Sequence, residues 1–431
     1  MSITGFLATV RALKNRNYRL FFIGNGISLI GTWMQTVTIG WLVYKLSHSS
    51  YTLGATGALG TLPVLLFSIF GGYVADRINR FRIILTTQTL AMIQALSLAI
   101  LTLTGHITVN HILFLSFVLG LINAFDIPAR QAFVVNIVEK KEELANAIAL
   151  NSFLVNSARL IGPSIAGVLV AAFGEGICFL INGISYIAVI FALLMMKVPS
   201  AKQVIDGREN ENVLKKLHEG FSYVKTFVPV RTVILYVGFF SIFGMFYGVL
   251  MPVFAKEIFH GTARTLGFLI GSGGTGAIIA AIYLASRSTH SGLGKIIHIA
   301  GIVFGTGLIL FSYTNNFWFA VMILIVVGAA MVLQIVTANI ILQTLVSDEK
   351  RGRVMSFHTL AFMGTQPIGS YIAGVLGKTI GTQGTVFVSG IICIIGAIIF
   401  KVKYVSFLKK IETTVMDDSQ RMLIKQTFSA Q

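Results

Sequence analysis

The sequence is poor in charged residues and in cysteine. Of its 431 residues, 11% are Asp, Glu, Lys or Arg, whereas an ordinary soluble domain carries roughly 25%. So few charges cannot cover a water-soluble globule of this length, which excludes a disordered chain and a soluble multidomain enzyme. The two cysteines, Cys178 and Cys393, both lie inside apolar runs. They exclude a disulfide scaffold and form no pair for zinc or redox chemistry.

Hydrophobic residues, in contrast, make up 55% of the chain, about what a dozen membrane spans of roughly 20 residues need. Twelve apolar stretches are long enough to cross about 30 Å of hydrocarbon. They cover residues 20–44, 50–75, 83–104, 110–134, 147–172, 177–196, 232–255, 265–285, 296–313, 317–343, 354–377 and 384–402. The sequence therefore predicts an all-α membrane protein with twelve transmembrane helices in two groups of six.

These stretches predict five parts of the chain. They are a cytoplasmic N-terminal segment (1–19), an N-terminal six-helix bundle (20–196), a cytoplasmic linker (197–230), a C-terminal six-helix bundle (231–402) and a cytoplasmic tail (403–431). In the linker, Leu214, Leu217, Phe221 and Val224 recur at steps of three, four and three. That spacing predicts an amphipathic helix on the cytoplasmic membrane face.

Lys and Arg predict the orientation of the spans, because cytoplasmic loops of membrane proteins hold most of these residues. With the N-terminus inside, 28 of the 33 cations fall in inside segments. Outside loops hold only Lys45, Lys256, Arg264 and Lys378, and Arg159 lies within a span. Both termini are predicted to be cytoplasmic. The net charge of +17 then reflects topology, and we expect no nucleic-acid partner.

The two halves of the chain resemble each other. Residues 162–174 (GPSIAGVLVAAFG) align with residues 369–381 (GSYIAGVLGKTIG) and share seven of thirteen positions. The second and eighth spans both end in a similar tetrapeptide, at residues 74–77 and 284–287. Two six-helix pseudo-repeats of this kind are a transporter architecture, with the substrate site between the halves.

The loop after the second predicted span carries a recognisable pattern. It reads Gly71-Gly72-Tyr73-Val74-Ala75-Asp76-Arg77-Ile78-Asn79-Arg80-Phe81-Arg82. This resembles the G-x-x-x-D-R-x-x-R-x-R signature of the major facilitator superfamily and implies the major facilitator fold. A carboxylate in a short turn can bridge to arginines or to a helix N-terminus. We therefore expect a cytoplasmic latch formed by Gly72, Asp76, Arg77 and Arg80, to which Asp126 and Arg130 also contribute.

The fifth predicted span contains Gly162, Pro163 and Gly167, which resemble the Gly-Pro motif of exporters in that superfamily. Packing alone also explains the small residues, since they let helices approach closely, and Pro163 bends the helix. Further stretches resemble the enterobactin-exporter-like branch, also called transmembrane secretion effectors, with macrolide efflux proteins nearby. They cover residues 16–21, 31–35, 125–131 and 146–152. The resemblance implies proton-linked export of a small molecule such as a siderophore.

Polar residues follow one face of the first span and one face of the fifth, at helical steps of three and four. Polar faces turn from lipid towards water, so we predict a substrate cavity. Its lining residues are Asn25, Thr32, Gln35, Ser152, Asn156, Arg159 and, from the eleventh span, His358. Arg159 either forms a structural pair with Asp126 or attracts an anionic or catechol-rich substrate, and we favour the second role.

Acidic residues are scarce in the spans. Of sixteen acids, only Asp76 and Asp126 are placed in or against predicted spans. Asp126 and Arg130 are four residues apart and can pair on one helix face. Either Asp126 or His358 is a candidate for the coupled proton, since a histidine titrates near neutral pH. For Asp126 a purely structural pairing is equally open, whereas a lone histidine such as His358 is more often a hydrogen-bonded structural residue.

Two other classes of membrane protein fit the sequence less well. An enzyme for prenyl or phosphoryl transfer needs clustered acids to hold a metal, and a channel needs a pore loop or a ring of acids; neither pattern is visible. We therefore expect a monomeric secondary active transporter of the bacterial cytoplasmic (inner) membrane, without cofactor or metal. It would export a small molecule in exchange for protons by alternating access, and a multidrug or macrolide-type efflux pump is the alternative.

Overall fold

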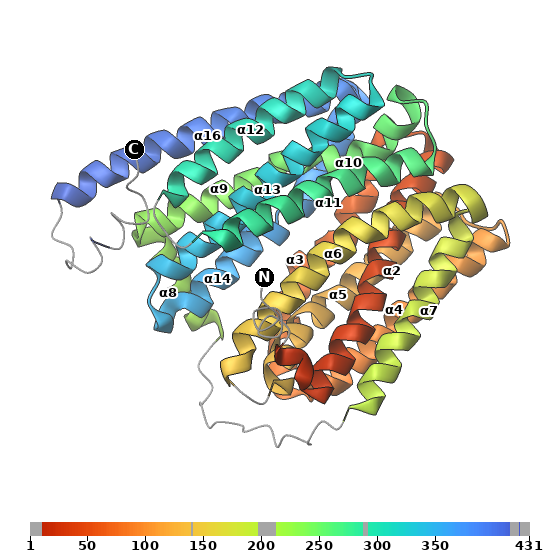
Figure 1. Ribbon diagram of the computed structural model, residues 1–431, viewed down its shortest axis with the longest axis horizontal. Helices are drawn as coiled ribbons and strands as arrows, with labels where there is room; N and C mark the ends of the chain where they lie inside the picture. The colour runs from red at the N-terminus through yellow and green to blue at the C-terminus, as the bar shows by residue number, and fades with distance from the viewer. Residues whose placement is uncertain (1–10, 139–140, 197–212, 288–291, 414–421, 423–431) are drawn as a thin grey trace. The chain divides into compact units, whose positions relative to one another are not determined.

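The protein is almost entirely helical. The computed structural model describes residues 11–138, 141–196, 213–287, 292–413 and Met422 (Figure 1). The elements are η1 (Arg11–Lys14), α2 (Arg16–Ser47), α3 (Ser50–Arg77), α4 (Arg80–Leu103), α5 (Val109–Ile137), α6 (Lys141–Phe173), α7 (Glu175–Met195), α8 (Val213–Thr226), α9 (Val228–Gly244), α10 (Phe246–Val253), the π-helical η2 (Phe254–Ile258), α11 (Ala263–Ser286), α12 (Leu293–Tyr313), α13 (Phe317–Leu345), α14 (Asp348–Met363), α15 (Gln366–Thr379) and α16 (Thr382–Thr413).

Side chains next to the loops fix where several helices begin. Asn15, Ser49, Thr108 and Asn316 each accept a hydrogen bond from the backbone N–H three residues later. Such caps satisfy a donor that has no partner inside the helix. The starts of α2, α3, α5 and α13 therefore follow directly from the local sequence.

Eleven helical spans in the described part of the chain are long and apolar enough to cross a membrane. They coincide with eleven of the twelve predicted stretches, the run from α9 to η2 (Val228–Ile258) counting as one span. The predicted stretch 354–377 is instead divided between α14 and α15. Pro367, at the start of α15, has no N–H, and its ring clashes with a helical carbonyl four residues earlier. The chain therefore turns at Gly364 and Thr365.

Large apolar side chains remain exposed along the spans. Phe70 on α3 is 61% exposed, Ile282 on α11 is 65% exposed and Trp318 on α13 is 70% exposed. Exposed apolar surface of this extent suits helices that contact lipid tails, because hydrocarbon imposes no free-energy penalty on apolar side chains.

The chain divides into two compact units. Unit 1 comprises Met1–Asp206 and Pro252–Gly271, and unit 2 comprises Gly207–Met251 and Ser272–Gln431. In unit 1, α3 packs on α5, α7 packs on both α2 and α4, and α2 also packs on α6 (Figure 1). Its core near the start of α2 contains Tyr18 and Phe21, and the Tyr18 hydroxyl donates to the Ala147 carbonyl at 2.7 Å.

In unit 2, α12 packs on α13 and α16, and α9 packs on α14 and α16. Val230, Ile341 and Phe400 belong to its core. The buried Tyr236 hydroxyl donates to Gln334 Oε1 at 2.5 Å and joins α9 to α13.

The predicted linker and tail contain helix. The helix α8 occupies residues 213–226 of the predicted linker, while residues 197–212 lie outside the described part of the chain. Phe221 of α8 lies 6.3 Å from Phe357 of α14, measured between ring centres, and Val224 is buried. The helix α16 continues through Thr413, so the first residues of the predicted tail (403–413) are helical, while the candidate span within α16 ends at Lys403.

Candidate functional site

The loop between α3 and α4 contains the predicted latch residues. Arg80 Nη2 lies 3.5 Å from Asp76 Oδ1, and the Asp76 side chain is 76% exposed. The Arg80 guanidinium also donates to Asn136 Oδ1 at 2.9 Å and so ties this loop to the end of α5. Arg77 lies 4.3 Å above the ring of Tyr73. An exposed ion pair contributes little to stability, so the Asp76–Arg80 pair can break at small cost.

Of the two glycines in this motif, Gly71 is the one that packing requires. A Cβ on Gly71 would lie 2.1 Å from the Ala124 carbonyl oxygen, whereas a Cβ on Gly72 would meet no atom within 4 Å in the described structure. Gly71 therefore lets α3 and α5 approach each other. The part of Gly72 in a latch stays a prediction.

A buried polar network joins α2, α4 and α5. The Asp126 carboxylate accepts hydrogen bonds from Thr87 Oγ1 at 2.7 Å, Gln88 Nε2 at 2.9 Å and Arg130 Nε at 2.9 Å. Arg130 completes the ion pair through Nη2 and donates from Nη1 to Asn25 Oδ1. Both Asp126 and Asn25 are almost fully buried. The predicted pairing of Asp126 with Arg130 is therefore confirmed.

This network leaves the Asp126 carboxylate with a full set of donors. An ionised carboxylate has about four lone-pair sites, and four N–H or O–H groups of Arg130, Thr87 and Gln88 point at it. In its structural role Arg159 was expected to pair with Asp126. Asp126 is instead paired with Arg130. Asn25, which was expected at a water-filled cavity, lies in the packed interior of unit 1.

A second buried network lies nearer the middle of α2. Gln35 Nε2 donates to Gln94 Oε1 at 3.0 Å, and Asn182 Nδ2 donates to Gln35 Oε1 at 2.8 Å. Gln94 Nε2 also donates to the Leu115 carbonyl at 3.1 Å. The three amides are at most 2% exposed and join α2, α4 and α7. A contact of Gln35 with substrate stays a prediction, since its amide already has protein partners here.

On α6, the predicted cavity residues lie next to the glycines of the Gly-Pro motif. Arg159 is half-buried, and its guanidinium carbon lies 5.5 Å from the centre of the Trp33 ring on α2, within the range of a cation–π contact. A Cβ on Gly162 would lie 2.6 Å from Trp33 Cβ, and one on Gly167 would lie 2.8 Å from the Ala263 carbonyl oxygen. These glycines allow α6 to pack against α2 and the start of α11. Pro163 is buried between them.

The remaining predicted cavity residues have different surroundings. Thr32 is half-buried, donates to the Ser28 carbonyl at 2.9 Å and lies 3.4 Å from the Tyr186 hydroxyl. Asn156 is half-buried on α6, one turn before Arg159. Ser152 belongs to α6, but its side chain lies outside the described part of the structure.

His358 lies in unit 2, on α14. It is 5% exposed, and its Nε2 has no hydrogen-bond partner among the described residues. A buried imidazole nitrogen without a partner is costly. A structural histidine was expected to be hydrogen-bonded. In the part of the chain that the structure describes, no group bonds Nε2 of His358.

Sequence reasoning missed several polar residues that the fold brings together. Gln88, Gln94 and Asn182 are isolated amides in apolar spans, and such residues face protein or water when they lie at membrane depth. The placement of only two acids against the spans was also wrong. Glu175 is the first residue of α7, is 8% exposed and pairs with Lys45 at 2.9 Å. The helix begins one residue after Gly174, whose φ of 82° is left-handed.

No three His, Cys, Asp or Glu side chains in the described ranges lie close enough together to hold a metal ion.

Known proteins match the chain along most of its length. The staphyloferrin A transporter of Staphylococcus aureus is 24% identical, with 87% of this chain and 94% of the relative aligned. The enterobactin exporter of Shigella boydii is also 24% identical, over 93% of this chain and 95% of its own length. Macrolide efflux protein A of Streptococcus pyogenes is 20% identical, over 88% and 96%.

The fold and the family agree with these matches. A crystal structure of a nucleoside transporter aligns with a TM-score of 0.70 at 14% identity and covers 91% of this chain and 99% of that chain. The model of the transmembrane secretion effector family matches residues 7–430. The chain therefore belongs to the transmembrane secretion effectors, within the major facilitator superfamily, and is a multi-pass transporter of the bacterial cytoplasmic membrane.

Proposed function

We propose that this chain exports a small organic molecule of the siderophore class in exchange for protons, by alternating access and as a monomer. The observation that carries the proposal is the match to the enterobactin exporter over 93% of this chain and 95% of that protein. A match of this extent leaves no large part of the chain for an unrelated activity. Macrolide efflux is the second candidate, because macrolide efflux protein A also aligns over nearly its whole length.

The proposed topology has twelve spans with both termini in the cytoplasm. Eleven helical spans of the described chain support it, and α14 and α15 together would supply the remaining one. A broken helix is tolerated in a membrane where neighbouring helices or water satisfy the freed backbone groups. The distribution of Lys and Arg supports the orientation.

Two ion pairs at the proposed cytoplasmic side differ in what they can do. The Asp126–Arg130 pair is buried and linked to Asn25, so we assign it to holding α2, α4 and α5 together. The Asp76–Arg80 pair is exposed, so its charges are available for a partner that comes and goes during transport. We propose that Asp76, with Arg77 and Arg80, acts as the cytoplasmic latch.

Arg159 is the strongest candidate for contact with substrate. It lies near the middle of α6 (Lys141–Phe173), where an arginine costs about 2.5–3.5 kcal/mol on insertion scales. Asp126 is already paired with Arg130. Arg159 is half-buried beside the Trp33 ring, which suits binding of an anionic or catechol-bearing molecule by charge and stacking. Asn156 and Thr32 would contribute hydrogen bonds.

His358 is the better candidate for the coupled proton. Protonation of Asp126 would break its hydrogen bonds with Arg130, Thr87 and Gln88. Protonation of His358 at Nε2 breaks no hydrogen bond to a described group, and an imidazole changes charge in the physiological pH range.

Growth under iron limitation tests the proposed function. We expect the medium of a deletion strain to lack an iron-chelating metabolite that accumulates in the cells, and wild-type protein to restore its secretion. Unchanged medium together with lower resistance to macrolides would instead support the second candidate. Complementation with His358→Asn tests the coupling residue, which we expect to insert normally and to export poorly.

A further inference from the structure

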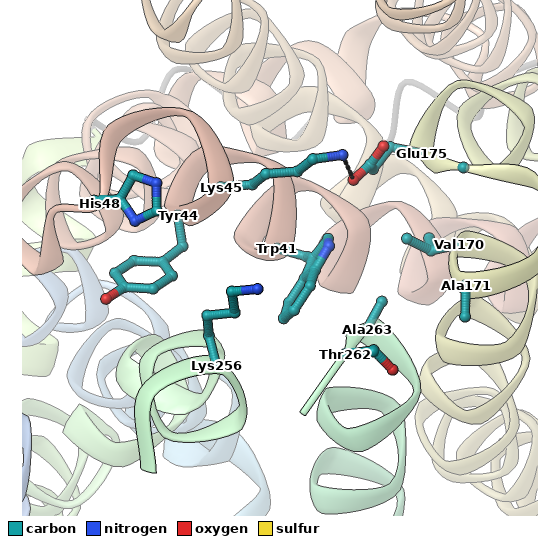
Figure 2. A pocket seen from close by; sticks show the side chains of 11 residues that line it. Trp41, Tyr44, Lys45, His48, Val170, Ala171, Glu175, Lys256, Thr262 and Ala263 are labelled. Atoms are coloured by element: carbon teal, nitrogen blue, oxygen red, sulfur yellow. Dashed lines mark hydrogen bonds and ion pairs between the residues drawn. The ribbon is translucent and has the colours of Figure 1, made fainter. Parts of the chain in front are cut away.

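A pocket of about 440 Å³ lies at the far end of α2 from Arg16, within unit 1 (Figure 2). The last turns of α2 and α6, the first residue of α7, Lys256 of η2 and the start of α11 line it. The volume is in the range of small-molecule sites, about 300–1,000 Å³. The lining residue His48 lies just before the start of α3, whereas the predicted latch residues Asp76 and Arg77 lie at the end of α3. In the proposed topology this pocket therefore faces the outside.

The pocket gathers cations that are rare on this side of the protein. Only Lys45, Lys256, Arg264 and Lys378 lie in the proposed outside loops. Lys45 and Lys256 both line the pocket, and Arg264 follows the lining residue Ala263 in the chain. The positive-inside rule disfavours Lys and Arg in the outside loops of a membrane protein. Their concentration at one pocket therefore points to a local purpose.

The acids near these cations already have partners. Glu175 is paired with Lys45 at 2.9 Å (Figure 2), and Glu257 accepts a hydrogen bond from the Tyr44 hydroxyl at 3.1 Å. In the described part of the chain the Lys256 ammonium makes no ion pair or hydrogen bond, and the residue is exposed. The pocket thus holds an ammonium group that is ready for an anion from solution.

The start of α11 adds to the positive field at Lys256, while the neighbouring Glu257 keeps its negative charge, because the Tyr44 hydroxyl that bonds it is neutral. The 24-residue helix α11 starts at the lining residue Ala263 with no acid in its first turn, so its positive helix end is not neutralised. Trp41 lines the same pocket as Lys45 and Lys256 (Figure 2) and supplies an apolar wall. A carbon skeleton can rest on this wall while its charged group meets the lysines.

We propose that this pocket binds small organic anions through a carboxylate and holds the exported molecule just before its release. Each lysine ammonium is a compact point charge with three donors, which can pair with a carboxylate oxygen without a fixed bidentate geometry. This inference rests on the proposed export function, but binding to the pocket can be measured without transport.

The test uses the purified full chain in nanodiscs of phosphatidylcholine and citrate as the probe, with binding measured by calorimetry. We expect citrate to bind and Lys256→Gln to weaken binding about tenfold, as loss of one charge-assisted contact does. Lys256→Arg should keep most of the affinity. Lys378→Gln, another exposed cation of the proposed outer side, is the matched control and should bind like wild type.

Glu175→Gln gives a prediction of the opposite sign. It removes a negative charge from the pocket and releases Lys45 from its ion pair, so citrate should bind several-fold more tightly. Binding should also weaken as salt rises from about 0.01 M to 0.15 M, because salt screens exposed charges.

Three results would overturn the inference: wild-type affinity in Lys256→Gln, an equal loss in Lys378→Gln, or binding only when anionic lipid is present. Because the measurement does not depend on transport, absent citrate binding in a protein that exports refutes only the pocket. Lys256-dependent binding in a protein that does not export supports the pocket and refutes the proposed function.

Discussion

Neutralising Asp126 should destabilise unit 1 strongly. Asp126→Asn keeps the shape of the side chain and removes the charge that Arg130 needs. The Asp126 side chain is 4% exposed and the Arg130 side chain is 22% exposed. Breaking a buried ion pair from one side costs about 3–5 kcal/mol, because the other charge is left buried. Arg130 retains Asn25 and some contact with water, so we expect the lower end, about 3 kcal/mol.

The chain carries a built-in reporter for this measurement. Cys178 and Cys393 are free and buried, so a thiol-reactive dye labels them only when the protein unfolds. For a unit of about 150–250 residues, 1 kcal/mol corresponds to about 2–4 °C, which predicts a Tm lower by roughly 6–12 °C. Removing both charges in Asp126→Asn/Arg130→Gln should cost less than the sum of the two single changes.

Asp76→Asn is the matched control, since it neutralises an acid that also pairs with an arginine four residues later but is 76% exposed. It should change stability by less than about 1 kcal/mol and slow transport through loss of the latch. Equal Tm values for wild type and Asp126→Asn would refute the assignment of Asp126 to structure.

Three further changes test other parts of the account. Arg159→Gln should reach the membrane with near-normal Tm and bind substrate at least tenfold more weakly, with Arg159→Lys intermediate because it keeps the charge but loses the planar fork; normal substrate affinity in the glutamine variant would contradict the binding role. Gly71→Ala should lower stability by about 1–3 kcal/mol, because the new methyl group meets a carbonyl of α5, whereas Gly72→Ala should be neutral; equal Tm values for these two variants would contradict the packing. An engineered cysteine at His106 should react with an impermeant thiol reagent added to intact cells and one at Asn79 should not, and the reverse pattern would overturn the topology.

The spans were predictable because length and hydrophobicity decide them almost alone. The exception is residues 354–377, where averaging over the apolar stretch hides Pro367. Its missing N–H ends α14 and begins α15. Pro63, Pro128 and Pro163 also lie within predicted spans, but α3, α5 and α6 continue through them. A proline in a predicted span therefore does not identify a break by itself.

The candidate site was only partly predictable. The pairing of Asp126 with Arg130 follows from a spacing of four on one helix, and the structure confirms it. Thr87, Gln88 and Asn25 reach the same pair from other helices, and periodicity within one helix contains no information about the register between two helices. The network could therefore be found only from the packed structure.

The polar face of the first span illustrates the same limit. Of the polar residues on this face, Asn25, Ser28 and Gln35 are buried and Thr32 is half-buried. The sequence does not say what the face meets. A stripe of polar residues satisfies its hydrogen bonds equally well with water or with facing amides, and in the structure Gln94 and Asn182 take that place for Gln35.

Transport into inverted membrane vesicles tests the central claim most directly. Vesicles from cells that overproduce the chain are energised so that their lumen becomes acidic, and are then given a metabolite extract of iron-starved cells. The account predicts that a metal-chelating small molecule accumulates in the lumen, that a protonophore abolishes the accumulation, and that vesicles without the chain show none. Equal lumen contents with and without the chain, across iron chelators and macrolides alike, would contradict proton-coupled export.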